Sequence, residues 1–314
     1  MTLFDIEFLN RKQASNLIYL IFVSSKFCGE SLLYSLLFLL FMNNQKRFNK
    51  ICQDIKEIKI QGARNIAKAA LYAYSLFPTK SSKNKLLSLR PTEPMLVNVL
   101  NKIEKEHYKT ILSHFDEAQK KINQNVLKII KNKLTIFTHC HSTNVVQALI
   151  YAKKHRKKFQ VYVTETRPLF QGRKTAKELE KAGIKVTLFA DSAAAIALEK
   201  ETKKDKIYSD LVFFGADAIL KDGVINKIGS RMFAEIAKNH KIPVYIIADS
   251  WKYSPENLKI EERSFHEVWK RVPKHIKIRN PAFELINRKY IKAIVSELGI
   301  LSYQQFLKKV KSIF

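Results

Sequence analysis

The sequence predicts an α/β protein in which an N-terminal helical domain precedes a doubly wound parallel sheet. Apolar residues recur at helical spacing between residues 45 and 129, and after Lys133 short β-rich runs alternate with helical stretches. Strands of about five apolar residues separated by helices of roughly 10–15 residues are typical of a parallel sheet covered on both faces. We therefore expect an apolar extension at 1–42, a helical domain at 43–131 and a Rossmann-like domain at 132–314.

The first 42 residues differ from the rest of the chain. The segment from Leu17 to Met42 is strongly apolar, but Lys26, Gly29 and Glu30 interrupt it, so neither half reaches the ~20 residues of a membrane span. No small-residue cleavage site of a signal peptide follows. An apolar helical hairpin packed on the body, a membrane anchor, and translated upstream sequence with a native start at Met42 remain as interpretations. The last is favoured because ordinary globular patterning begins after Met42.

Helical spacing dominates the next 90 residues. The apolar positions between residues 45 and 75 lie on one helical face, and Gly62 within them either breaks the helix or allows close backbone approach. Residues 78–85 are polar and predict a loop. From Leu96 to Ile129 the helical spacing continues, which predicts one or two long helices with a kink.

Five short apolar runs predict the strands of the sheet, namely Leu134–Thr138, Phe159–Thr164, Lys185–Ala190, Leu211–Gly215 and Val244–Ala248. The helical stretches between them lie at about 143–156, 174–182, 192–200 and 229–240. In such a sheet the ligand lies beyond the carboxyl ends of the strands. Unusual polar residues follow every predicted strand, so we expect them to meet at one edge of the sheet.

Cys140 and Asp217 are the candidate acid–base pair at this edge. Cys140 follows the first strand and precedes a helix that Ser142 or Thr143 can cap, so the helix dipole is expected to lower the pKa of its thiol. Facing Asp217 across the strand ends, this thiol could exchange protons with a bound substrate. The alternative is that Cys140 is a small buried packing residue.

Cationic residues near the same edge are candidate anion ligands. Arginine and lysine, with a helix N-terminus near Gly229, could hold phosphate. Arg90 stands at a helix entrance that Thr92 can cap, which is a reasonable anion site. Structural interpretations exist as well: Glu165 with Arg167 forms a local ion pair, Asp191 only caps its helix, and Asn226 is a turn residue.

Composition narrows the class of protein. The net charge of +28 suits nucleic acid, an acidic membrane surface or anionic substrates, but the lysines are spread along the chain, which favours ordinary solvated surface positions. Three unevenly spaced cysteines (Cys28, Cys52, Cys140) allow no disulfide framework and no CxxC zinc site, which favours a reducing cytoplasm. We expect no metal, no cofactor, no nucleic-acid partner and no membrane contact for the body of the chain.

Four segments, in a fixed order, resemble motifs of one known family: Thr138-His139-Cys140, Thr164-Glu165-Thr166-Arg167-Pro168 with Gln171-Gly172, Gly215-Ala216-Asp217, and Asn226-Lys227-Ile228-Gly229. That family unites ribose-1,5-bisphosphate isomerases, methylthioribose-1-phosphate isomerases and the alpha, beta and delta subunits of translation initiation factor 2B. The resemblance runs from about Ile51 to the C-terminus, and it includes Arg90-Pro91-Thr92 and Asn280-Pro281-Ala282-Phe283-Glu284.

The resemblance implies an enzyme, because the factor subunits lack the thiol–carboxylate pair that Cys140 and Asp217 provide. The chain looks most like the archaeal isomerases that convert ribose 1,5-bisphosphate to ribulose 1,5-bisphosphate in AMP degradation. On this resemblance Cys140 and Asp217 transfer protons, with the division of roles between them open. The implied substrate-binding residues are Gly62, Ala63, Arg64, Arg90, Arg167, Gln171, Asn226 and Lys227.

Two departures from the family pattern keep alternatives open. His141 stands where the isomerases commonly carry asparagine, and Gly62-Ala63-Arg64-Asn65 is less glycine-rich than expected. The alternatives are an isomerase of another sugar 1-phosphate, such as methylthioribose 1-phosphate, and a factor-like regulatory subunit. The resemblance also implies a cytoplasmic homodimer or homohexamer, with AMP as a candidate activator.

Overall fold

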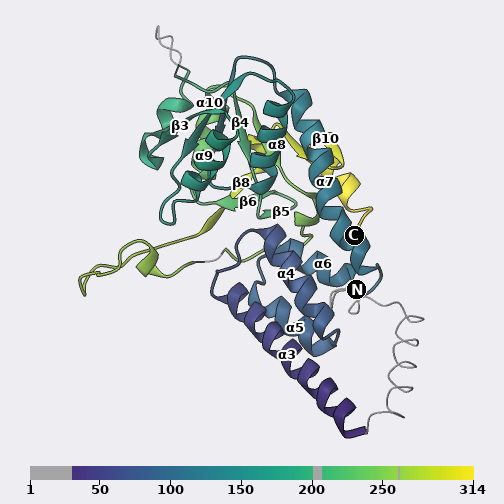
Figure 1. The fold of residues 1–314 in the computed structure, drawn as a ribbon. Helices are drawn as coiled ribbons and strands as arrows, with labels where there is room; N and C mark the ends of the chain where they lie inside the picture. Colours follow the sequence, from purple (N-terminus) through teal and green to yellow (C-terminus); the bar gives the residue numbers. More distant parts are fainter. Residues whose placement is uncertain (1–29, 201–206, 261) are drawn as a thin grey trace.

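The computed structural model describes residues 30–200, 207–260 and 262–314 and confirms the α/β class (Figure 1). Five helices come first: α3 (Glu30–Lys56), α4 (Ala63–Leu76), α5 (Lys80–Leu89), α6 (Pro94–Lys102) and α7 (Tyr108–Ile129). Among the described residues, no helix combines the length and the hydropathy that a membrane span requires. The interpretations of residues 1–29 lie outside the described residues, and α3 runs without interruption through the boundary expected at residue 42.

Gly62 breaks the first helical pattern, as one of the two expectations had it. Its φ of 84° lies in the left-handed region, which glycine adopts without the Cβ penalty, and α4 begins directly after it. The loop predicted at 78–85 is wrong, because α5 begins at Lys80. Thr79 caps that helix by accepting a hydrogen bond from the Ser82 N–H at 3.1 Å, and Leu86 anchors it in the core.

The main sheet has seven strands in the order β10-β9-β7-β4-β1-β2-β3. The strands are β1 (Leu134–Thr138), β2 (Phe159–Thr164), β3 (Lys185–Phe189), β4 (Leu211–Phe214), β7 (Val244–Ile247), β9 (Ala293–Ser296) and β10 (Gly299–Leu301). All neighbours are parallel except the β9–β10 pair. The five predicted strands are therefore confirmed to within one residue at each end, whereas β9 and β10 escaped prediction.

Helices cover both faces of this sheet, as Figure 1 shows. Alternate residues of each strand point to opposite faces, so Ile136 packs with α7, α8 (Thr143–Lys154) and α9 (Gln171–Lys181), while Phe137 packs with α10 (Ser230–Asn239) and α11 (Tyr303–Val310). A small antiparallel sheet of β5 (Ala218–Ile219), β6 (Gly223–Lys227) and β8 (Phe283–Asn287) lies beside the main sheet. Short 3-10 turns complete the fold: η1 (Asp191–Ala197), η2 (Ser250–Lys252), η3 (Phe265–Glu267) and η4 (Arg288–Tyr290).

Candidate active site

The strand order places the candidate site. The six parallel strands β3, β2, β1, β4, β7 and β9 follow the order 3-2-1-4-5-6 of a doubly wound sheet, which reverses direction between β1 and β4. Ligands of such sheets bind at this switch point, outside the carboxyl ends of the strands. Cys140 comes directly after β1 and Asp217 directly after β4, so the topology sets the thiol and the carboxylate on the two sides of one crevice.

A cavity of about 160 Å³ occupies this crevice. Its wall includes both candidate acid–base residues and all but one of the predicted binding residues: Gly62, Ala63, Arg64, Arg90, Cys140, Gln171, Asp217, Asn226 and Lys227. The first four come from the N-terminal helices, so the helical segment closes the open edge of the sheet. The site is therefore shared between the two parts of the chain.

Arg167 is the predicted residue that does not line the cavity. Its guanidinium lies 5.0 Å from the centre of the Phe170 ring, and its Nη2 donates to the Val268 carbonyl at 3.3 Å. The predicted ion pair with Glu165 is also wrong, because Glu165 pairs with Arg173 at 2.7 Å. In this structure Arg167 belongs to the surface beside the site.

Asp191 holds the loop that follows β2. Its two carboxylate oxygens accept the backbone N–H groups of Thr166 at 2.8 Å and Arg167 at 2.7 Å. The side chain makes no cap of its own 3-10 turn, so the capping interpretation was wrong. The Thr166 hydroxyl in turn accepts the Cys140 N–H at 3.0 Å, which ties this loop to the thiol-bearing turn.

The turn at Cys140 is left-handed, with a φ of 66°. The carbonyl of Cys140 accepts a hydrogen bond from the Thr175 hydroxyl at 2.8 Å. Ser142 caps α8, as predicted, by accepting the Val145 N–H. The lowered thiol pKa that this cap suggested is wrong: burial raises the pKa of Cys140 to about 11, although the Lys227 ammonium acts in the opposite direction. Desolvation outweighs the Lys227 charge and the hydrogen bond from the His141 backbone, which both lower this pKa.

Asp217 shares this buried environment. Burial raises the pKa of its carboxyl, while the nearby cations Lys252, Lys227, Arg90 and Arg263 lower it. The Lys252 Nζ donates a hydrogen bond at 2.6 Å to the carbonyl of Ala216, the residue that precedes Asp217. Both members of the candidate pair are thus shifted towards their protonated forms, in which each can donate a proton.

His139 and His141 flank Cys140 in the sequence. His139 Nε2 donates to the Ile228 carbonyl at 2.9 Å, while burial lowers the pKa of its imidazole to about 4. His141 contacts the hydroxyl of Thr175 at 3.0 Å through Nδ1, and burial lowers its pKa to about 4 as well. Both rings are therefore neutral near pH 7 and position the turn around Cys140.

Asn226 and Lys227 lie at the end of β6 rather than in a turn, so the turn interpretation of Asn226 was wrong. The Asn226 amide donates to the Ser230 hydroxyl at 2.9 Å, and that hydroxyl donates to the Lys227 carbonyl at 2.6 Å. The Lys227 ammonium lies 4.9 Å from the centre of the Phe283 ring. Gly229, with a φ of 99°, begins α10 but is not part of the cavity wall.

Sequence reasoning missed several side chains of the cavity wall, chiefly Glu93, Lys174, Asp249, Lys252 and Arg263. A signal existed for Asp249, since it follows the fifth predicted strand, and for Lys252, three residues further on. Arg263 gave none, because it lies in the long segment between β7 and β8 and directly follows no predicted strand. With these residues the wall carries six cationic side chains and three carboxylates.

Comparisons with known proteins bear directly on this arrangement. The chain is 33% identical to the ribose 1,5-bisphosphate isomerase of Archaeoglobus fulgidus over 79% of its length and 88% of that protein. It is 35% identical to the enzyme of the same name from Methanocaldococcus jannaschii, covering 80% and 90% of the two chains. The structure of translation initiation factor eIF-2B from Pyrococcus horikoshii OT3 superposes with a TM-score of 0.71 at 26% identity, covering 82% of this chain and 97% of that one.

The same comparisons establish the family. Residues 96–303 match the model of the initiation factor 2 subunit family, which covers β1, β4 and both strand ends that carry Cys140 and Asp217. The two isomerases match this chain over 79% and 80% of its length. The chain is a member of the initiation factor 2 subunit family, and the relatives to which it is similar include sugar-phosphate isomerases.

Proposed function

We propose that this protein is an aldose–ketose isomerase that converts ribose 1,5-bisphosphate to ribulose 1,5-bisphosphate, in the degradation of nucleotides such as AMP. The observation that carries the proposal is that Cys140 and Asp217 line one cavity whose wall is predominantly cationic. The isomerases of Archaeoglobus fulgidus and Methanocaldococcus jannaschii support the choice of substrate.

The reaction asks for the chemistry that this pair can supply. A 1-phosphorylated aldose has a locked anomeric carbon, so the ring must open while the phosphate stays attached, and a proton must leave carbon 2 and return to carbon 1. Because burial raises the pKa of Asp217, its carboxyl retains a proton that it can give to the ring oxygen. Cys140 takes the proton from carbon 2 and returns it to carbon 1, and the Asp217 carboxylate recovers a proton from the carbon 2 hydroxyl as the ketone forms. The Lys227 ammonium favours the thiolate when Cys140 acts as the base.

The charges of the cavity suit a bisphosphate. Its wall carries six cationic side chains and three carboxylates, and Arg64, Arg90 and Lys227 are among the expected substrate-binding residues. The N-terminus of α4 also reaches the cavity: Gly62 supplies no side-chain cap, so the first backbone N–H groups of the helix are available to an anion. Arg167 is left out of this set, because its guanidinium lies outside the wall.

The direct test is conversion of ribose 1,5-bisphosphate to ribulose 1,5-bisphosphate by the purified protein, with methylthioribose 1-phosphate as the competing substrate. Cys140→Ser and Asp217→Asn should each lower kcat by about 10²–10⁴-fold, the usual contribution of an acid–base group. Cys52→Ser is the matched control, because Cys52 is buried in the separate core of the N-terminal helices. Near-full activity of Cys140→Ser would reject the assigned role.

The same experiment decides the competing function. The likeness to eIF-2B of Pyrococcus horikoshii OT3 extends over most of both chains, so a factor-like regulatory subunit is the alternative. Absence of conversion of both sugar phosphates would favour that alternative. The assay run with and without AMP, together with the mass in solution, tests the further expectations of AMP activation and of a homodimer or homohexamer.

A further inference from the structure

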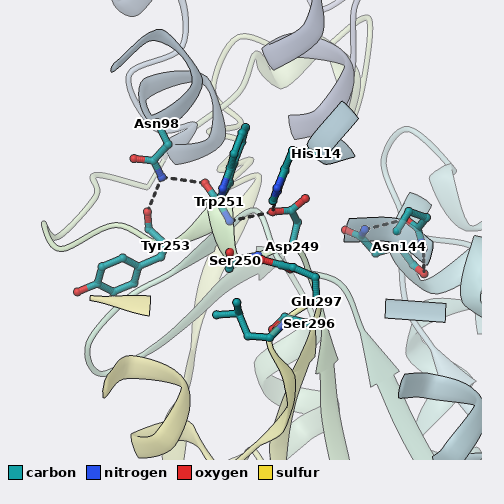
Figure 2. A network of polar contacts seen from close by, with 11 residues as sticks. Asn98, His114, Asn144, Asp249, Ser250, Trp251, Tyr253, Ser296 and Glu297 are labelled. Carbon is teal, nitrogen blue, oxygen red and sulfur yellow. Dashed lines mark hydrogen bonds and ion pairs between the residues drawn. The ribbon is translucent and has the colours of Figure 1, made fainter. Parts of the chain in front are cut away.

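A polar cluster beside the cavity takes no part in the proton transfers described above. It consists of His114 from α7, Asp249 after β7 and Glu297 after β9, and Figure 2 shows the three side chains converging. One nitrogen or oxygen atom of each lies within 4.8 Å of the others. Asp249 is also part of the cavity wall, so the cluster reaches the space that the substrate would occupy.

Asp249 is held through one of its two oxygens. Oδ1 accepts the Trp251 N–H at 2.8 Å and contacts His114 Nε2 at 3.1 Å. Because an ionised carboxylate only accepts, Nε2 carries the hydrogen of this bond. The imidazole is itself fixed, since it stacks on the Trp251 ring with centres 3.6 Å apart and planes 3° from parallel. Within the described part of the chain, no hydrogen bond ends on Oδ2, which leaves that oxygen for a ligand.

The backbone that carries the cluster is pinned to the N-terminal helices. The Asn98 amide of α6 donates to the carbonyls of Trp251 at 2.8 Å and Tyr253 at 2.9 Å, as Figure 2 shows. The Asn125 amide of α7 donates to the Ser296 carbonyl at 2.9 Å, next to Glu297. The carboxylate of Asp249 therefore has a defined position before any ligand enters, which reduces the entropic cost of binding.

Glu297 is half-buried beside the buried carboxyl group of Asp249. Its Oε2 accepts the Ser250 N–H at 3.1 Å. Burial and the neighbouring charge of Asp249 raise the pKa of Glu297 to about 7, so below that pH it holds a proton. The titratable groups that face it are Asp249 and His114, and the Lys102 ammonium lies beyond them, 5.2 Å from the Trp251 ring.

We propose that Asp249 is a substrate-positioning residue, whose Oδ2 accepts a hydrogen bond from a hydroxyl of the bound sugar. A carboxylate repels phosphate, and the only donors of a sugar bisphosphate are its hydroxyl groups, so the contact is to the carbon chain between the phosphates. His114 and Glu297 act through Asp249. His114 orients its carboxylate, and Glu297, when protonated, keeps the two neighbouring carboxyl groups at a single negative charge. This inference rests on the proposed function.

Asp249→Asn is the sharpest variant, because it keeps an oxygen for Trp251 and His114 and replaces only the second oxygen by a donor. A hydrogen bond to a charged group contributes about 1.5–3 kcal/mol, so kcat/KM should fall by roughly 10–100-fold. Glu235→Gln, an exposed acid on α10, is the control and should stay within a factor of about two. Both variants should unfold at the wild-type temperature.

Deoxy analogues separate positioning from mere support of the fold. Ribose 1,5-bisphosphate and its 2-deoxy and 3-deoxy forms are compared as ligands of wild type and Asp249→Asn. For the analogue that lacks the contacted hydroxyl, the two proteins should bind equally, whereas a structural defect weakens all ligands alike and would overturn the inference. Glu297→Gln should remove any rise of KM above pH 7, because glutamine cannot ionise.

The outcomes distinguish this inference from the proposed function. If wild type is active and Asp249→Asn equals the control, the positioning role is overturned and the proposed function stands. If wild type converts no sugar phosphate but binds ribose 1,5-bisphosphate, and Asp249→Asn weakens that binding, the proposed function fails and the positioning role stands. If wild type neither converts nor binds it, both fail.

Discussion

The pKa of the Cys140 thiol is open to direct measurement by alkylation, because only the thiolate reacts. Burial raises this pKa from an ordinary 9.0 to about 11. At pH 8 the ionised fraction then falls from about one in ten to about one in a thousand, so alkylation should be roughly 100-fold slower than for an ordinary thiol. Poor access alone would also slow the reaction, so the pH at which the rate is half-maximal is the measured quantity.

Two substitutions set the direction of the effect. Asp217 raises the pKa of Cys140, so Asp217→Asn should shift the midpoint to lower pH. Lys227 lowers it, so Lys227→Met should shift the midpoint upward. The assay is iodoacetamide labelling between about pH 7 and 12, with the Cys140 peptide quantified by mass spectrometry. A wild-type midpoint at or below pH 8, or shifts in the opposite order, would refute the burial argument.

Three further predictions concern stability. The raised pKa of Glu297 means that the folded state binds the proton more tightly, so the wild type should lose about 3 kcal/mol of unfolding free energy between pH 4.5 and 7. Glu297→Gln should not show this loss. Urea unfolding at pH 5 and 8 measures it, and equal pH dependence of both proteins would contradict the prediction. Gly172→Ala should lower the unfolding free energy by at least ~2 kcal/mol, since a Cβ would lie 1.7 Å from the Thr164 carbonyl oxygen. An unchanged melting temperature would show that the first turn of α9 can move to make room. Tyr303→Phe should cost about 1–3 kcal/mol, because the single hydroxyl hydrogen of Tyr303 serves the two buried carbonyls of Leu220 and Gly223, which lie 2.7 and 2.6 Å from its oxygen; a neutral result in the same thermal assay would mean that water replaces it.

The strands and the ends that carry the site were predictable because both depend on local pattern. Short apolar runs set β1, β2, β3, β4 and β7, and the structure places Cys140 after β1, Asp217 after β4 and Asp249 after β7 in the cavity wall, whereas the residues after β3 lie outside it. The failures have a common cause. α5 has one buried anchor, Leu86, in a polar stretch, and β9 has only four residues, which pair with β10 directly after it and with the distant β7, so neither element offers a long local pattern.

The residues of the site also divide into those with a local sequence signal and those that only packing places. Residue types and their spacing predicted Cys140, Asp217, Arg90 and Lys227, but Arg167 was placed by its motif alone and proved to contact Phe170 and Val268 instead. Only packing brings distant residues such as Arg263 to the cavity wall. The direction in which a long side chain points depends on neighbours that the chain supplies a hundred residues later.

The chain's own pattern was enough to predict an α/β fold, the edge of the sheet at which the cavity lies, and the thiol and carboxylate that line that cavity. The protonation state of Cys140 and Asp217 depends on the tertiary structure. A helix N-terminus after Cys140 pointed to a lowered pKa, and burial reversed it, because desolvation depends on everything that packs around the thiol and not on the residues next to it. The support that His114 and Glu297 give to Asp249 likewise exists only where three separate segments meet.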